Sequence, residues 1–252
     1  GDRDITHVSL GEAAKASLLR RNDAGNMVVE RGVIAVGTPP RLPERGVALA
    51  VKLRQFNADH WRRLFEPDAG GAAAPTAGSA ALPISQIDLR TDELTLYGRT
   101  IAALHLNAQL AGRQWKAEVK SRDAAGQLTW DGQGAGRLTG RLTHLTIPEA
   151  PTAKADVAAS ATADEMPSID LAVEHFSLHG NELGRLNLKA DNARDGYWNA
   201  QLEVRNDDAT LSGEGRWRPS STAPETQLDF KLASRNIERL LDRLGYADAV
   251  RR

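Results

Sequence analysis

Apolar and polar residues alternate with a period of two along most of this chain. Between positions 104 and 110, for example, Leu104, Leu106 and Ala108 are separated by the polar residues His105 and Asn107. This period is typical of a β-strand with one apolar face and one face in water. The same alternation predicts further strands at residues 47–53, 115–119, 128–130, 186–190 and 226–232.

The N-terminal segment has features of both a helix and a strand. Residues 13–21 are rich in helix-forming residues, but Ala14, Ala16 and Leu18 also alternate with polar or small residues. The turn-like residues that follow lead directly into the β-rich run 27–36. We therefore expect a β-hairpin here in preference to a helix.

One β-module occurs twice in the sequence. Ile87 and Ile169 each begin an Ile-Asp-Leu phrase, and they lie 82 residues apart. Trp115 and Trp198 correspond after one additional residue. Apolar positions also match at this spacing between residues 94–98 and 176–180, and between residues 104–108 and 186–190. So many coincidences at one spacing indicate a duplication.

Each copy contains an interruption of the two-residue period. Leu89 and Leu94 are five residues apart, as are Leu171 and Phe176. A regular strand would put the members of each pair on opposite faces. The spacing therefore predicts a β-bulge or tight bend at the same place in both copies.

Two strand-like segments run into short amphipathic helices. Asn57 precedes residues 58–65, and Asn236 precedes residues 237–244; both runs have helical apolar spacing. Asparagine is a favoured N-cap because its side-chain oxygen accepts a hydrogen bond from the first turn. We predict a helix of about two turns at each place.

Two segments rich in Ala, Gly and Pro divide the chain. These are residues 66–83 and 149–167, and neither has the periodicity of a packed element. We interpret both as flexible linkers or loops. The resulting modules are 1–65, a β-module ending in a helix, 84–148, the first β-repeat, and 168–252, the second β-repeat with a terminal helix.

Composition narrows the classes of function. The net charge of -1 in 252 residues provides no basic surface for nucleic acid. Cysteine is absent, and no run of ~20 apolar residues could span a bilayer. The polar N-terminus lacks a signal-peptide pattern and an initiator Met. We expect both ends to be cuts through a longer protein.

The two predicted helices are too short to cover the apolar face of the predicted sheet. Two helices of about eight residues cover only ~12 Å each, too little for a sheet of roughly a dozen strands. A sandwich, a closed barrel and an open groove all remain compatible with the pattern. We predict a mainly β fold of repeated antiparallel strands, forming a long curled sheet or open groove with two short helices.

The polar residues form no catalytic or metal-binding pattern. His175 and His179 would share a strand face but lack a third ligand, and residues 132–136 resemble turn glycines more than a phosphate loop. Asp88 and Asp170 recur in the two copies, where we expect a structural role at the bend. We predict no catalytic residue, no metal and no cofactor.

Several phrases resemble the AsmA-like family, in particular its long YhdP-type members towards their C-terminal part. These phrases are residues 30–37, 87–98, 125–130, 136–142, 211–217 and 237–246. The resemblance implies a protein anchored by an N-terminal helix in the inner membrane of Gram-negative bacteria. It also implies a repeating β-groove in the periplasm that carries phospholipid towards the outer membrane.

These observations lead to one main hypothesis and two alternatives. The main one is a non-enzymatic segment whose apolar face holds acyl chains, with adjoining modules of the same long chain as further partners, and neither nucleic-acid binding nor a membrane span. The alternatives are a scaffolding module for envelope proteins and, least favoured, an enzyme acting on envelope glycans or lipids. The predicted lining consists of Leu49, Val51, Leu53, Leu104, Leu106, Ala108, Trp115, Ala117, Leu186, Leu188, Ala190, Leu228, Phe230 and Leu232.

Overall fold

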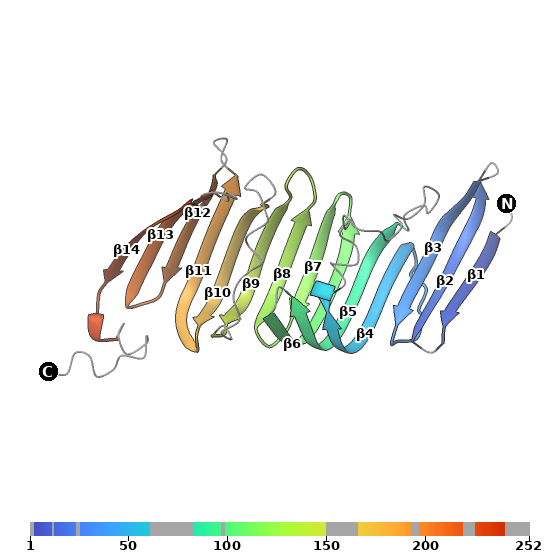
Figure 1. Cartoon of the computed structure of the whole chain (residues 1–252), viewed down its shortest axis with the longest axis horizontal. Coiled ribbons are helices and arrows are strands. Elements are labelled where there is room, and N and C mark those ends of the chain that lie inside the picture. Colours follow the sequence, from blue (N-terminus) through green and yellow to red (C-terminus); the bar gives the residue numbers. More distant parts are fainter. Residues whose placement is uncertain are drawn as a thin grey trace. The chain divides into compact units, whose positions relative to one another are not determined.

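The computed structural model describes residues 3–11, 13–23, 26–60, 83–96, 99–149, 166–192, 197–218 and 225–239. This part of the chain contains fourteen strands (Figure 1). The first seven are β1 (Arg3–Leu10), β2 (Ala14–Asp23), β3 (Asn26–Val36), β4 (Gly46–Asn57), β5 (Ile84–Leu96), β6 (Arg99–Ala111) and β7 (Gln114–Lys120). The other seven are β8 (Ala124–Asp131), β9 (Arg137–Ile147), β10 (Ser168–Leu178), β11 (Asn181–Asn192), β12 (Trp198–Arg205), β13 (Ala209–Arg218) and β14 (Glu225–Ser234).

The strands follow one another in the sheet in the order of the sequence, β1 to β14. Most neighbours are antiparallel, including β2 with β3, so the predicted N-terminal hairpin is confirmed. Among the described strands, β3 with β4, β4 with β5 and β9 with β10 are parallel. The predicted mainly β fold, with mostly antiparallel strands in a curled sheet, is confirmed. The parallel pairs are an addition that the sequence pattern did not indicate.

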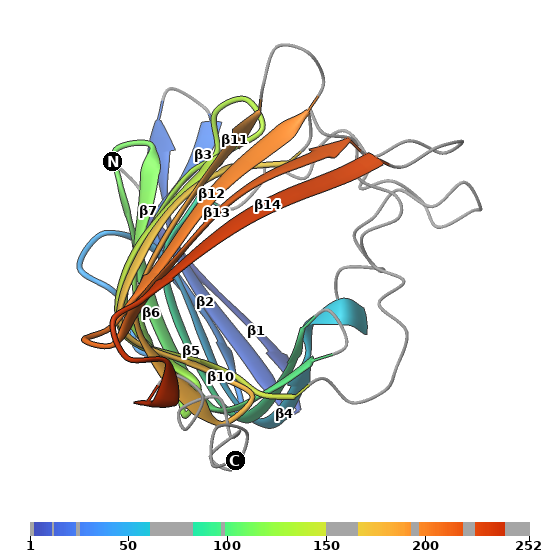
Figure 2. The same cartoon turned by 90° about the vertical axis from the view of Figure 1, so that its left-hand side faces the viewer.

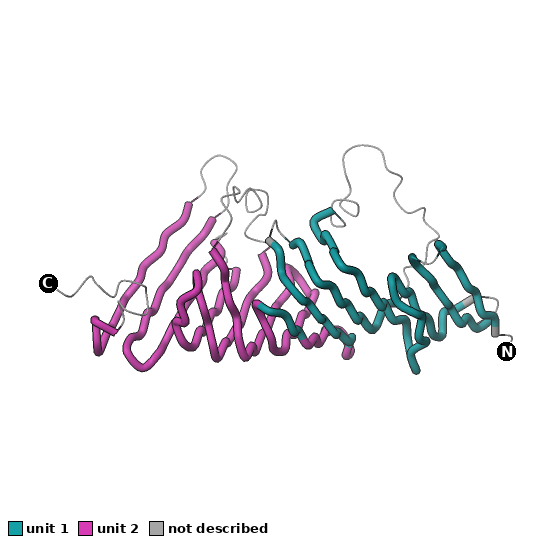
Figure 3. The backbone as a smooth tube through the Cα atoms, turned by 90° about the horizontal axis from the view of Figure 1, so that it is seen from below, with its two compact units in different colours: residues 1–110, 119–122 teal, residues 111–118, 123–252 magenta. Residues whose placement is uncertain are grey.

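The chain forms two compact units, which Figure 3 colours separately. Unit 1 comprises residues 1–110 and 119–122, and unit 2 comprises residues 111–118 and 123–252. Unit 1 therefore contains β1 to β6, unit 2 contains β8 to β14, and β7 contributes to both. Within each unit the strands are curved rather than flat (Figure 2).

The division into three modules remains a prediction. Nearly all of the predicted linkers, 66–83 and 149–167, lies outside the described residues. The strands on either side of each linker are hydrogen-bonded neighbours in the same unit, since Val51 pairs with Leu89 and Gly140 with Leu171. Both segments therefore connect parallel strands of one sheet.

The second copy contains the predicted bulge, and the first copy interrupts the alternation at the equivalent place without a register shift. In β10 the register with β11 shifts between Val173 and Phe176. The side chains of both residues belong to one buried cluster, although they are three residues apart. In the first copy, Thr91 and Leu94 are likewise both buried, at 4% and 6% exposure. A bulge bends its strand and increases the local twist, and so contributes to the curvature of the sheet.

Both predicted helices begin where expected. The Asn57 side-chain oxygen accepts a hydrogen bond of 3.0 Å from the backbone N–H of His60. Asn236 accepts one of the same length from the N–H of Arg239. These bonds confirm the two N-caps. Helical residues are described at 58–60 and 237–239; the remainder of each predicted helix lies outside the described residues.

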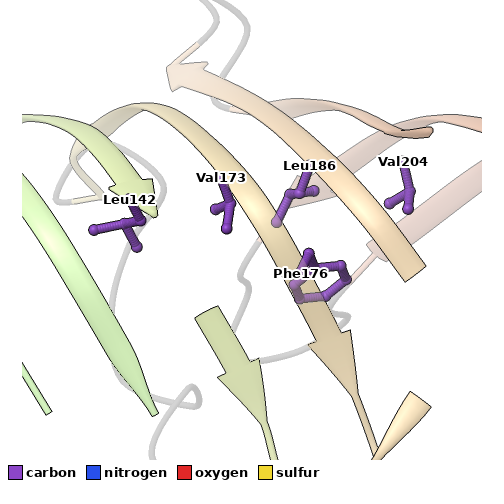
Figure 4. Close-up of a cluster of buried hydrophobic side chains, with 5 residues drawn as sticks. All are labelled: Leu142, Val173, Phe176, Leu186 and Val204. Carbon is purple, nitrogen blue, oxygen red and sulfur yellow. The ribbon is translucent and has the colours of Figure 1, made fainter. Parts of the chain in front are cut away.

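The main buried cluster lies on one face of unit 2. It contains Leu142, Val173, Phe176, Leu186 and Val204, each at most 7% exposed, from four neighbouring strands, β9 to β12 (Figure 4). Half-buried aliphatic side chains from β8 to β13 pack against it. The core is thus built from side chains on one face of a sheet.

In unit 1 the connection between β3 and β4 crosses the face of the sheet that carries Ala48 and Ala50. Thr38 and Pro39 line a hollow together with Ala48 and Ala50, which face away from Leu49 and Val51 by strand alternation. Most of the residues that line this hollow share the face of Ala48 and Ala50, so the connection lies against that face.

Candidate functional site

One face of unit 1 carries aliphatic side chains in register across β4, β5 and β6. Register partners on neighbouring strands project to the same face of a sheet. Three cross-strand rows can therefore be followed across these strands, Leu49–Ile87–Ala108, Val51–Leu89–Leu106 and Leu53–Thr91–Leu104. Thr91 is the one polar member, and its hydroxyl donates to the carbonyl of Glu93 at 2.8 Å. The face thus presents no unsatisfied hydroxyl at this position.

Unit 2 has an equivalent face that extends over five strands from β10 to β14. Its three rows contain only aliphatic, aromatic and glycine residues. They are Ile169–Ala190–Ala200–Gly215–Leu228, Leu171–Leu188–Leu202–Gly213–Phe230 and Val173–Leu186–Val204–Leu211–Leu232. Gly213 and Gly215 leave room for the Phe230 and Leu228 side chains, which a β-carbon would contact. We call these rows, together with the three of unit 1, the apolar face of each unit.

The other face is polar in unit 2 and mixed in unit 1, where Val33 and Ala35 on it are 1% exposed. In unit 1, Asp88, Arg90 and His105 lie on it, and in unit 2 the residues between the apolar rows are almost all charged or amide-bearing. In unit 2 they include Asp170, Asn187, Lys189, Gln201, Glu203, Ser212, Glu214, Asp229 and Lys231. In unit 2 one face is therefore suited to water and the other to an apolar ligand.

Exposure increases along the apolar face of unit 2 towards β14. Val173 and Leu186 are 3% and 4% exposed, whereas Leu228, Phe230 and Leu232 are 60%, 57% and 56% exposed. The described strands form a single sheet, and no second sheet lies against it in that part of the chain. The apolar side chains of β14 therefore face solvent.

Comparison with models of protein families identifies the family of the chain. The model of the YhdP protein family matches residues 1–252, the whole of the chain. The chain belongs to the YhdP family. No curated protein and no solved structure matches it. None of the helices in the described residues is long and apolar enough to cross a membrane.

The predicted lining residues of this YhdP-family chain lie on the apolar faces. Register places the six predicted residues of β4 and β6 together in unit 1, and the six of β11 and β14 together in unit 2. Trp115 and Ala117 lie on the half-buried side of β7. Sequence reasoning named only part of each row; the same alternation would also have found Leu171, Leu202 and Leu211. That these residues line a lipid groove remains a prediction.

The recurring aspartates are each paired with a cation in their own unit. Asp88 lies 3.1 Å from Arg90 and 3.2 Å from His105, and Asp170 accepts a hydrogen bond of 2.9 Å from Arg141. These contacts support a structural role in holding strands together on the polar face. Asp170 also lines a hollow on the polar face that contains a second acid, Asp191, together with Arg137 and Lys189.

The other polar candidates are also accounted for by local structure. His175 lies 3.2 Å from Glu182, and the described residues contain no group of three potential ligands around a metal site. Gly134 and Gly136 have φ of 61° and 90° in the turn between β8 and β9. These left-handed conformations agree with the interpretation of this segment as turn glycines.

Two titratable groups at the ends of strands in unit 2 have shifted pKa values. The pKa of Asp131 is lowered, chiefly because the Gln114 side chain and the Gln133 N–H donate hydrogen bonds to its carboxylate. The pKa of Tyr197 is raised because its hydroxyl donates to Glu225 at 2.8 Å. Both residues are half-buried at the surface, so these shifts describe surface contacts rather than a buried acid–base site.

Proposed function

We propose that this chain is a non-enzymatic segment of a periplasmic lipid-transport protein whose apolar faces hold the acyl chains of phospholipid. The single observation that carries the proposal is the aliphatic face of each unit, whose described strands form one layer of sheet. Membership of the YhdP family and the long β-sheet fit a bridge-like protein between the inner and outer membranes. The adjoining partners would be further modules of the same long chain.

The energetics of such a face suit transport. Burying a methylene group contributes ~0.8 kcal/mol relative to water, so an acyl chain prefers the aliphatic rows to solvent strongly. A bilayer offers the chain a similar apolar environment. Exchange between the bilayer and the protein is therefore near neutral, which permits both loading and release.

The distribution of charge predicts weak selectivity for the head group. The three rows of unit 2 contain no charged side chain, and the charged residues lie on the other face. Recognition by the rows would thus be confined to the acyl chains. A phosphate group would remain outside them because burying an unpaired charge is costly.

A scaffolding role is the second candidate, and the exposed β14 strand favours it. Leu228, Phe230 and Leu232 are more than half exposed on the last described strand, which has a neighbour on only one side. An unpaired strand edge with apolar side chains is also a site for pairing with another protein. The two candidates differ in what covers the apolar face.

Lipid extraction from the purified chain tests the proposal. We expect mass spectrometry to find phospholipids of mixed head group bound to the native chain. Phe230→Asp, which places a charge on the apolar face, should reduce bound lipid several-fold. Gln227→Asp is the matched control, because it adds the same charge to the other face of the same strand. A chain free of lipid, or equal loss in both variants, would contradict the proposal.

A further inference from the structure

Four tryptophans lie at one end of the strands in unit 2. Trp115 is the second residue of β7, Trp130 the penultimate residue of β8, Trp198 the first of β12 and Trp217 the penultimate of β13. Trp198 and Trp217 are cross-strand partners. The fifth tryptophan, Trp61, lies outside the described residues. We call the set of four the tryptophan rim.

Strand register places the members of the rim along the same edge of the unit. The starts of β9 and β10 pair in parallel, at Arg137 and Ser168, and Trp130 pairs with the residue after Arg137. On the far side of β10, Trp198 pairs with the last residue of β11. The Gln114 side chain donates to Asp131 at 3.2 Å, which brings the start of β7 beside the end of β8.

All four indoles project from the apolar face. Trp198 and Trp217 continue the register of the apolar rows, two residues beyond Ala200 and Gly215. Trp130 alternates with Leu128, which packs against the buried cluster. Gln114 and Asp131 are the sequence neighbours of Trp115 and Trp130, and their side chains meet on the polar face. Because successive residues of a strand point to opposite faces, Trp115 points to the apolar face.

The indoles are positioned between apolar and aqueous surroundings. Trp130 is 38% exposed, and the other three are half-buried. Trp198 donates its ring N–H to the Pro167 carbonyl at 3.1 Å. Gly136 carries no β-carbon where the Trp130 ring lies, so the ring can cover the turn between β8 and β9. Each indole ring thus places its apolar body on the sheet and lies near the edge of the sheet, where polar groups are present.

Arginines lie on the polar face at the same edge. The guanidinium carbons of Arg216 and Arg218 are 4.3 and 4.8 Å from the centre of the Tyr197 ring. Arg218 also forms a 2.8 Å ion pair with Glu225. These contacts hold the exposed guanidinium groups beside the rim, and arginine pairs well with phosphate oxygens.

The edge of unit 2 opposite the rim carries different residues. There β10 and β11 are joined through His179, and β12 and β13 through Asp207 and Asp208. Every tryptophan and tyrosine in the described residues of this unit lies at the edge of the rim. The two edges therefore offer different chemistry to a bound amphiphile.

We infer that the tryptophan rim holds the glycerol and head-group end of a bound phospholipid, while its acyl chains extend along the strands away from this edge. The inference rests on the proposed function and adds a direction to it. Indole rings collect at the boundary between hydrocarbon and head groups in membranes for the same physical reason. The eight residues of β12 span about 26 Å, more than the ~15 Å of one hydrocarbon leaflet, so the chains fit along the face.

Depth-dependent quenching of single-tryptophan chains tests the inference. The chain is loaded from vesicles of phosphatidylcholine that carries a spin label on the head group or near the end of an acyl chain. Gel filtration then removes the vesicles. Variants retain Trp130 or Trp198 alone, with Phe at the other tryptophan positions. We expect the head-group label to quench them at least twofold more than the chain label.

The matched control places the reporter on the apolar face at the middle of β14, away from the rim. Phe230→Trp in a background with Phe at all five natural tryptophan positions should show the opposite order. If lipid co-elutes but rim and control variants show the same order, the inference is wrong and the proposed function stands. If no lipid co-elutes, both fail. Quenching that requires intact vesicles would assign the rim to a bilayer surface and overturn the inference.

Discussion

Two truncations on the same apolar face test whether that face is open in solution. Leu186 is 4% exposed within the buried cluster, and Leu→Ala changes at such sites cost about 2–5 kcal/mol. Phe230 is 57% exposed on β14. Full burial of a Phe side chain contributes up to ~3 kcal/mol, and less than half of this side chain is buried. We therefore expect Leu186→Ala to cost about 3 kcal/mol and Phe230→Ala about 1 kcal/mol.

Urea unfolding followed by circular dichroism measures these costs as free energies of unfolding. Lys231→Ala is the control, because Lys231 is exposed on the other face of the same strand, and it should change the free energy by less than about 0.5 kcal/mol. A cost of about 3 kcal/mol for Phe230→Ala would refute the reasoning, since it would mean that protein covers β14. If that cost grows with protein concentration, the cover is a second copy of the chain.

Two further predictions concern the turn and the strand ends of unit 2. Gly136→Ala should destabilise the chain by about 1–3 kcal/mol and lower Tm, because a β-carbon there would overlap the Trp130 ring and φ is 90°. Gly134→Ala is the control and should cost less, because there is open space around Gly134. Equal costs for the two variants would count against the contact between Gly136 and the Trp130 ring. The lowered pKa of Asp131 means that its stabilising contribution is present above the ordinary carboxyl pKa and is lost as pH falls through the lower folded-state value. In an NMR titration, Gln114→Ala should raise this pKa towards its ordinary value, and an unchanged pKa would rule out the assigned cause.

The sequence was sufficient to predict features that depend on local periodicity. Alternation identified the strands and assigned Leu104 and Leu186 to the faces where register places them. The interrupted spacing between Leu171 and Phe176 predicted a bend because a strand has only two faces. Asn57 and Asn236 were recognisable as N-caps because capping involves residues within one turn.

Features that depend on contacts between distant segments were not predictable in this way. Parallel pairing of β4 with β5 requires a long connection, whereas an antiparallel pair needs only a short turn. The Ala/Gly/Pro-rich composition of residues 66–83 is compatible with a connection of either kind, so we interpreted it as a linker between modules. The partners of Asp88 and Asp170 likewise depend on register between strands.

The sequence predicted the apolar character of the candidate site but only some of its residues. The apolar rows follow from alternation, yet the rows of unit 2 also use Gly213 and Gly215, which no hydrophobic pattern would select. The rim was visible in the sequence only as the matched pair Trp115 and Trp198. Its other two members became recognisable when register brought the ends of β8 and β13 to the same edge.

The parallel pairs explain how repeated β-modules can extend an apolar face without new chemistry. The second copy begins at β10, which pairs in parallel with β9, and β5 pairs in the same way with β4. Each copy therefore enters an existing sheet with its apolar residues in register with those of the preceding strand, as Val173 is with Leu142. A one-residue error in this register would turn every apolar side chain of the new copy to the polar face.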